Sequence, residues 1–286
     1  MAIKDLRGRK FLVTGAASGI GRALALAAAA EGAELVLTDL AADGLDDTVR
    51  AVRERGGSVL HAAALDVSDY DAVSAFAADV HQRAGALDVV ANVAGTSVWG
   101  TVDALEHRHW KQMVDVNLMG PIHVIENFVP TMIEAGRGGH LVNVSSAAGL
   151  LALPWHAAYS ASKFGLRGVS EVLRFDLHRH RIGVSLVVPG AVRTPLVNSV
   201  QIVGVDRDHP AARKLTARFE RHAASPEKVA GCILAGIRKN RFLVYTSFDV
   251  RFGYWWARKF APPYNLVMQL ANNYFSRTLE AVRTRR

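Results

Sequence analysis

The residues with the clearest chemical potential are a serine, a tyrosine and a lysine near the middle of the 286-residue chain. Tyr159 and Lys163 lie four positions apart among small and apolar residues typical of a helix, which places both side chains on one helical face. Ser146 ends a short segment that begins at His140 and is typical of a buried strand. A free tyrosine has a pKa of about 10, and a nearby ammonium lowers it. The trio therefore predicts proton transfer at an alcohol or carbonyl, although a Tyr-x-x-x-Lys spacing also occurs by chance in many helices.

A glycine-rich turn near the N-terminus predicts a dinucleotide-binding site. A short apolar strand beginning at Lys10 runs into the turn, and an alanine-rich helix ending near Ala30 follows it. Glycines in such a turn let the backbone bend tightly and approach a pyrophosphate at the helix N-terminus. The residues of this turn that we expect to contact the cofactor are Gly15, Ser18, Gly19, Ile20 and Gly21.

The second predicted strand begins at Glu34 and ends in an acid, Asp39, which lies 18 residues after Gly21. At that distance a carboxylate can bond the adenosine ribose hydroxyls and repel a 2′-phosphate. Ser18 and Leu40 supply no cation for such a phosphate, so the pattern favours NAD over NADP. An ordinary strand-end acid is the alternative interpretation of Asp39.

Strands and helices then alternate along the chain. We expect helices over residues 45–55 and 70–84, strands over 58–65, 87–91, 140–146, 183–188 and 241–245, and one long helical region over 102–135. This alternation predicts an α/β fold with a Rossmann-type doubly wound parallel sheet in a single domain. We expect a catalytic domain over 1–246, with a substrate lid over about 190–225, and a C-terminal extension over 247–286.

Composition sets further limits. The net charge of +8 comes from basic residues that are mostly scattered, which favours a solvated surface over a nucleic-acid site. A single cysteine, Cys232, forbids an internal disulfide and fits a reducing, cytoplasmic location. No run of apolar residues is long enough to span a membrane, and the eleven histidines form no recognisable metal-binding pattern.

The chain resembles the short-chain dehydrogenase/reductase superfamily from about residue 8 to residue 245. The motifs that carry the resemblance are Thr14-Gly-Ala-Ala-Ser-Gly-Ile-Gly21, Asp66-Val67, Asn92-Val-Ala-Gly95, Asn117, Ser146, Tyr159-x-x-x-Lys163 and Pro189-Gly-Ala-Val-Arg-Thr194. One departure is Val93, where the family usually carries a second asparagine, and we expect it to affect local backbone support alone.

The resemblance implies roles for the central residues. Tyr159 is the expected acid and base, and Ser146 the hydrogen-bond partner of the substrate oxygen. Lys163 is expected to lower the pKa of the tyrosine and, like Tyr159, to contact the cofactor, through the nicotinamide ribose. Asn117 is expected to hold a water that links Lys163 to solvent, with a structural role at a helix kink as the alternative.

The other cofactor contacts that the resemblance implies come from loops after the strands. Asp66 and Val67 are expected to contact the adenine, and the residues expected to line the path of the cofactor are Asn92, Ala94 and Gly95. The nicotinamide end is assigned to Pro189, Gly190, Val192 and Thr194.

The extension contains Phe252, Trp255 and a periodic apolar segment from Leu266 to Val282. We expect it to roof the substrate pocket or to pack against another subunit, and contact with a membrane surface is the less favoured alternative. The predicted function is transfer of a hydride between NAD(H) and a hydrophobic secondary alcohol or ketone, such as a steroid, retinoid or lipid, by a homodimer or homotetramer. An NADP-dependent 3-oxoacyl reductase and a non-catalytic dinucleotide sensor are the alternatives.

Overall fold

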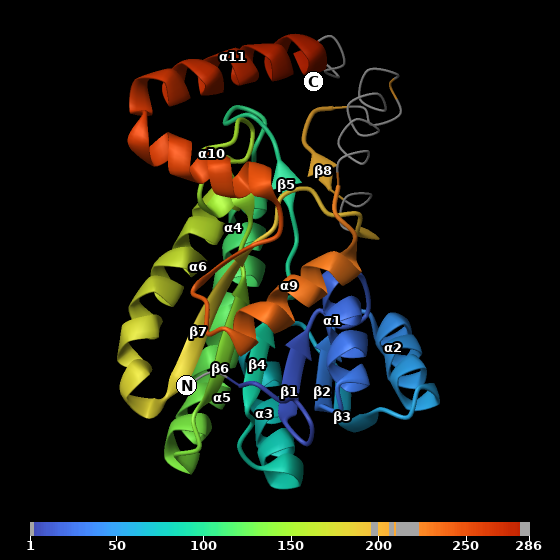
Figure 1. Ribbon diagram of the computed structural model, residues 1–286. Coiled ribbons are helices and arrows are strands. Elements are labelled where there is room, and N and C mark those ends of the chain that lie inside the picture. The colour runs from blue at the N-terminus through green and yellow to red at the C-terminus, as the bar shows by residue number, and fades with distance from the viewer. Residues whose placement is uncertain (1–2, 196–199, 206–208, 210–222, 281–286) are drawn as a thin grey trace.

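The computed structural model describes residues 3–195, 200–205, 209 and 223–280, with the backbone alone at 275, 276 and 278–280. Seven strands form one parallel sheet in the order β3-β2-β1-β4-β6-β7-β9 (Figure 1). Their bounds are β1 (Lys10–Thr14), β2 (Glu34–Asp39), β3 (Ser58–Ala64), β4 (Val89–Asn92), β6 (Gly139–Val144), β7 (Ile182–Val188) and β9 (Leu243–Tyr245). The predicted doubly wound α/β sheet is confirmed. Its strand order reverses beside β1, and in such sheets ligands bind near the carboxyl ends of the strands at that point.

Alternating apolar residues on the strands bury both faces of the sheet. Phe11 and Val13 of β1 join one core, whereas Leu12 joins the other. The first core is covered by α1 (Gly19–Ala30), α2 (Ala42–Glu54) and α9 (Pro226–Arg238), and the second by α3 (Tyr70–Ala84), α5 (Gly120–Ala135) and α6 (Ala157–Asp176) (Figure 1). Continuous apolar strands are thus explained by helices on both sides.

The long helical region predicted from residue 102 differs from the structure in two ways. It begins later, with α4 (His107–Val114), because the Glu106 amide donates a hydrogen bond to His109 Nδ1 at the start of that helix, 3.0 Å away. It also passes through a π-helical turn, Asp115–Met119, before α5. Two short strands were not predicted, β5 (Val98–Trp99) and its partner β8 (Gln201–Ile202). Each strand has two residues, and so short a segment shows no detectable periodicity in the sequence.

The C-terminal extension forms α10 (Phe248–Lys259) and α11 (Ala261–Glu280), beyond the carboxyl ends of the strands (Figure 1). Val250 and Tyr254 are buried against Leu150, but Phe252 and Trp255 are exposed. Part of the extension thus packs on the domain through Tyr254, and its expected role as a pocket roof or subunit contact stays a prediction. Among the described residues no helix is both long and apolar enough to cross a membrane. Most of the predicted lid (residues 196–199, 206–208 and 210–222) lies outside them.

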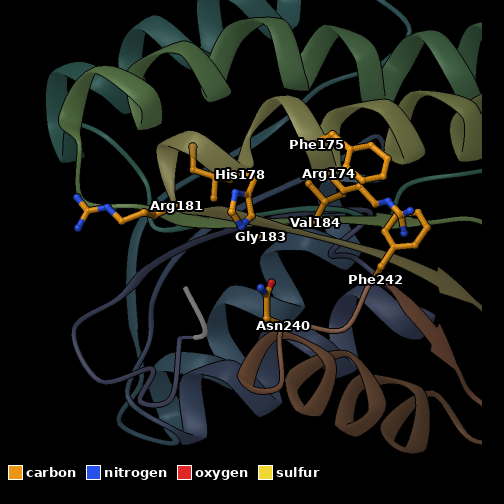
Figure 2. Close-up of a pocket in the computed structure, with 9 residues that line it drawn as sticks. Arg174, Phe175, His178, Arg181, Gly183, Val184, Asn240 and Phe242 are labelled. Carbon is orange, nitrogen blue, oxygen red and sulfur yellow. The ribbon is translucent and has the colours of Figure 1, made fainter.

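A cavity of about 370 Å³ lies near the amino end of β7 (Figure 2). β9 pairs with β7 only from Leu186 onward, so the edge near Gly183 borders the cavity instead of another strand. The Arg174 guanidinium lies 4.4 Å from the ring centroids of both Phe175 and Phe242, and these three side chains form one wall. The cavity is at the opposite end of β7 from Pro189, far from the residues with predicted catalytic roles.

Gly183 offers a test of packing at this edge. A Cβ there would lie 2.2 Å from Asn240 Oδ1 and 2.6 Å from His140 Nδ1. We expect Gly183→Ala to lower the free energy of unfolding by about 1–3 kcal/mol, measured by urea denaturation, because both neighbours must move. The matched control is Gly231→Ala in α9, where a Cβ meets nothing within 4 Å. That change should raise stability by about 0.5–1 kcal/mol, and equal effects of the two substitutions would contradict the packing argument.

Candidate active site

Two adjacent serines follow β6 and point to different partners. Ser146 begins a 3₁₀ turn, Ala147–Gly149, and its Oγ accepts a hydrogen bond from the Ala148 amide at 3.2 Å. The same side chain lies beside the phenol of Tyr159 and lowers its pKa. Ser145 instead donates from its buried Oγ to the Lys163 carbonyl at 3.1 Å. Only Ser146 therefore adjoins the phenol.

Lys163 is buried beneath the phenol. Its Nζ donates to the Val144 carbonyl at 3.1 Å and lies 5.8 Å from the centroid of the Tyr159 ring. The residue is 4% exposed, and this burial lowers the pKa of its ammonium from 10.5 to about 8. The four-residue spacing places both groups on one face of α6, as predicted.

The pKa of Tyr159 differs in direction from the sequence-based expectation. Burial raises the pKa of its phenol, and the Ser146 side chain opposes that rise. Tyr159 is thus a neutral phenol near pH 7, a suitable proton donor to a carbonyl oxygen.

Asn117 lies in the π-helical turn and uses its side chain as a clamp. Its Oδ1 accepts from the Thr96 amide, and its Nδ2 donates to the Thr96 carbonyl, both at 2.9 Å. These contacts are those expected of a structural role at a helix kink. The other expected role of Asn117, holding a water that links Lys163 to solvent, stays a prediction. Gly95 fits beside the clamp because it has no side chain: a Cβ there would lie 3.0 Å from Asn117 Oδ1 and 3.4 Å from Lys163 Nζ.

The first and third glycines of the N-terminal turn permit close backbone contacts. Gly15 has a φ of 69°, and a Cβ there would lie 2.8 Å from the Ala94 nitrogen. A Cβ on Gly21 would lie 1.9 Å from the Gly15 carbonyl oxygen. Thr14 Oγ1 accepts from the amides of Val93 and Ala94 at 3.0 Å. Val93 contributes to this contact through its backbone, which agrees with the limited effect expected of its side chain.

The middle glycine connects the turn with a segment far along the chain. Gly19 has a φ of 52°, and a Cβ there would lie 3.1 Å from Thr194 Cγ2. The Thr194 amide donates to the Val192 carbonyl at 2.9 Å, which fixes this approach. Ser18 is exposed and Ile20 is half-buried at the start of α1. The structure thus brings the predicted pyrophosphate turn next to the predicted nicotinamide contacts.

The carboxylate of Asp39 is held by two backbone amides. Its Oδ2 accepts from Ala17 and its Oδ1 from Ala41, each at 2.9 Å. The side chain therefore fixes the glycine-rich turn against the end of β2. This holds whether Asp39 binds the adenosine ribose or is an ordinary strand-end acid. Leu40 beside it is exposed, and no ion pair of the described residues involves Asp39.

The remaining predicted contacts lie in loops at the same edge of the sheet. Asp66 Oδ1 accepts from the amide and the hydroxyl of Ser68 at 2.8 and 2.7 Å. The Val67 carbonyl lies 3.0 Å from a ring nitrogen of His123. The Pro189 carbonyl accepts from Ala147 at 2.8 Å. Gly190 packs under α10, since a Cβ there would lie 3.1 Å from Val250 Cγ2.

Asn92 does not line the cofactor path with its side chain. It is buried, and its Nδ2 donates to Asn143 Oδ1 at 2.9 Å. Asn143 in turn donates to Ser170 Oγ at 2.9 Å, and Ser170 donates to the Leu166 carbonyl at 2.7 Å. This amide ladder (Asn92, Asn143, Ser170) joins β4, β6 and α6. Sequence reasoning missed the ladder, although a lone asparagine within the apolar strand β6 was a usable signal.

Aromatic rings stand beside Tyr159. The Trp99 and His156 ring centroids are 4.4 Å apart, and that of Tyr159 is 6.2 Å from His156. His156 Nδ1 lies 2.6 Å from the Pro154 carbonyl, and burial lowers the pKa of the ring, which is therefore neutral near pH 7. In the described part of the chain no group of three or more His, Cys, Asp or Glu is placed to hold a metal.

The buried Lys163 makes stability depend on pH in a predictable direction. Burial favours the neutral amine, so between about pH 8 and pH 10.5 the unfolded chain binds more protons at this position than the folded chain. Relative to Lys163→Met, the free energy of unfolding of wild type should rise across that window, by up to about 3 kcal/mol. Urea denaturation of both proteins without cofactor measures the difference. Lys239→Met, at an exposed position, is the control, and a constant difference for Lys163→Met would contradict the assignment.

Comparisons with known proteins agree with this geometry. The family model "short chain dehydrogenase" matches residues 9–202. A putative oxidoreductase of Mycobacterium tuberculosis, SadH, is 35% identical over 251 residues, covering 87% of this chain and 90% of the relative. An uncharacterized NAD-dependent oxidoreductase of the same species is 36% identical, covering 72% of this chain and 79% of the relative. A Burkholderia phymatum short-chain dehydrogenase/reductase crystallised with NAD has a TM-score of 0.82 at 28% identity, covering 90% of this chain and 95% of that one. The chain belongs to the short-chain dehydrogenase/reductase superfamily of oxidoreductases.

Proposed function

We propose that this oxidoreductase transfers a hydride between NAD(H) and a hydrophobic secondary alcohol or ketone. The observation that carries the proposal is the placement of the Ser146 side chain beside the phenol of Tyr159, with the Lys163 ammonium beneath the phenol ring. This arrangement suits a carbonyl oxygen that needs one hydrogen bond and one proton.

Binding of NAD is supported by the chain's own residues. Gly15, Gly19 and Gly21 form a side-chain-free cradle at the N-terminus of α1, which suits a pyrophosphate. Asp39 is anchored beside that cradle, where a carboxylate favours ribose hydroxyls over a 2′-phosphate. When bound, the nicotinamide ring supplies or accepts the hydride.

The protein residues are proposed to manage the proton and the developing charge. In reduction, the Tyr159 hydroxyl donates its proton to the substrate oxygen, and in oxidation the phenolate takes it back. The Ser146 hydroxyl donates a hydrogen bond to the same oxygen, which stabilises negative charge there. Lys163 supports the phenolate by its positive charge and is proposed to bond the nicotinamide ribose.

A hydrophobic substrate is supported by the surroundings of Tyr159. The ring packs against a cluster that includes Val98, Met113 and Val203. Trp99 and His156 stack beside it, and His156 is neutral near pH 7. These described neighbours of the phenol are apolar or neutral, which supports an apolar molecule around a single oxygen.

The proposals on assembly and location rest on separate features. A homodimer or homotetramer is supported by exposed apolar side chains on α6, with Phe164 40%, Val172 58% and Phe175 66% exposed. A cytoplasmic location is favoured by the single cysteine, Cys232.

The role of the phenol is tested by Tyr159→Phe. Turnover should fall by a factor of about 10²–10⁴, because the proton donor is lost, while the Kd for NAD stays within a few-fold. Steady-state kinetics and fluorescence titration with NADH measure the two quantities. Substantial residual kcat would refute the assignment.

The adjacent serines provide matched controls. Ser146→Ala should lower kcat by about 10²–10³ with little loss of stability, since its hydroxyl faces the substrate. Ser145→Ala should instead lower the free energy of unfolding by about 1 kcal/mol and largely retain kcat, because its bond to the Lys163 carbonyl is structural. The reverse pattern would show that the catalytic serine is Ser145.

Cofactor preference is tested at Asp39. Wild type should prefer NAD over NADP by orders of magnitude in kcat/KM, read from nicotinamide absorbance. Asp39→Asn keeps an oxygen for one of the two backbone amides but removes the charge, so the preference should shrink while the fold is retained. Comparable use of both cofactors by wild type would favour an NADP-dependent reductase instead.

A further inference from the structure

The outer face of α10 carries a row of aromatic side chains, the aromatic row, formed by Phe248, Phe252 and Trp255. These residues are 77%, 50% and 50% exposed, although each is large and apolar. Successive ring centroids along the row lie 5.9 and 5.8 Å apart, so the rings form one continuous strip. The strip points away from the buried Val250 and Tyr254, which already attach α10 to the domain. The row is therefore not needed to hold the extension in place.

The second helix of the extension also exposes an apolar stripe. The half-buried side chains of α11 recur at helical spacing and are Tyr264, Met268 and Ala271. The exposed apolar stripe, a quarter-turn or so away, comprises Leu266, Val267, Leu270 and Tyr274, each 44–59% exposed. The exposed polar side chains are Asn265, Gln269, Asn272 and Asn273. The helix thus has an inner, an apolar and a polar face, and among the described residues only the inner one is covered.

The charge of the extension is strongly one-sided. Residues 247–286 hold seven arginines and lysines but only two acids, so they supply more than half of the net charge of +8. On α10 the exposed Arg251 and Lys259 lie beside the aromatic row, whereas the exposed Arg258 donates to Tyr254 Oη at 3.0 Å. Asp249 is the single acid of that helix. A second copy docking on this face would bring two basic surfaces together, which is unfavourable. Anionic lipid headgroups would neutralise it.

We propose that α10 and α11 bind the surface of an anionic lipid bilayer, with the aromatic row and the apolar stripe in the interfacial region. Phenylalanine and tryptophan next to lysine and arginine are the composition of helices that lie in a membrane interface. The described helices are not apolar enough to span a bilayer, which agrees with binding at its surface. This proposal differs from the sequence-based preference for a pocket roof or a subunit contact and does not depend on the identity of the substrate.

The position of the extension gives the contact a defined orientation. α10 and α11 lie beyond the carboxyl ends of the strands, on the side of the sheet where the catalytic residues are proposed (Figure 1). The Ala152 amide donates to Tyr264 Oη at 2.9 Å, and Ala152 belongs to the loop that leads to Tyr159. The membrane surface would therefore lie next to the loops that border the proposed substrate site.

Vesicle sedimentation tests the proposal with the full-length protein. At physiological salt, the protein should pellet with vesicles of phosphatidylcholine mixed with phosphatidylglycerol, and much less with phosphatidylcholine alone. The double variant Phe252→Ser/Trp255→Ser should bind at least about tenfold more weakly, because it removes two interfacial anchors. The matched control, Tyr70→Ser, removes an aromatic side chain that is 48% exposed at the start of α3 and should bind as wild type does.

Three outcomes would overturn the proposal. One is absence of wild-type protein from the anionic pellet. Another is equal binding of wild type and the double variant, which would mean adsorption by net charge alone. The third is a lower molar mass of the double variant than of wild type in light scattering, which would identify the row as a contact between copies. NADH titration of every variant verifies that each one is folded.

Discussion

Two reciprocal hydrogen bonds join the end of β6 to α6, and the proposed active site depends on them. Lys163 Nζ donates to the Val144 carbonyl, while Ser145 Oγ donates to the Lys163 carbonyl. The turn after β6 packs very close to these bonds and has room only because Gly149 lacks a side chain. A Cβ on Gly149 would lie 2.3 Å from Ser145 Oγ. Burying an ammonium is costly unless it is hydrogen-bonded, and the Val144 carbonyl offsets part of that cost. The helix is thereby held in the one position that places Tyr159 against Ser146.

Loops distant in sequence reach this point because parallel strands end at one edge of the sheet. The segment after β4 passes Lys163 at Gly95 and is clamped by Asn117. The segment after β7 returns to the N-terminal turn, where Thr194 contacts Gly19. Each contact depends on a missing side chain or on a paired amide, so the site is positioned by backbone proximity more than by side-chain packing.

Much of this arrangement follows from sequence patterns. Apolar strands alternating with helices predicted the parallel sheet, and four-residue spacing placed Tyr159 and Lys163 on one helical face. Local patterns carry no information on what a polar group meets after folding. The π-helical turn, the inward orientation of Asn92 and the raised pKa of Tyr159 are all set by tertiary neighbours. Helical periodicity likewise identified the apolar face of the extension but not whether protein covers it.

The amide ladder has a consequence for how the sheet assembles. Asn92 and Asn143 are direct neighbours in the register of β4 and β6, both strands in the centre of the sheet. A slip by one residue would set Asn92 beside Val142 or Val144, with its amide buried and unpaired at a cost of about 1–3 kcal/mol. Val90 and Ala91 would still be apolar in the slipped pairing, so hydrophobic burial alone discriminates weakly between registers. The ladder therefore specifies the alignment of β4 and β6. It destabilises misaligned strand pairings more than it stabilises the native pairing.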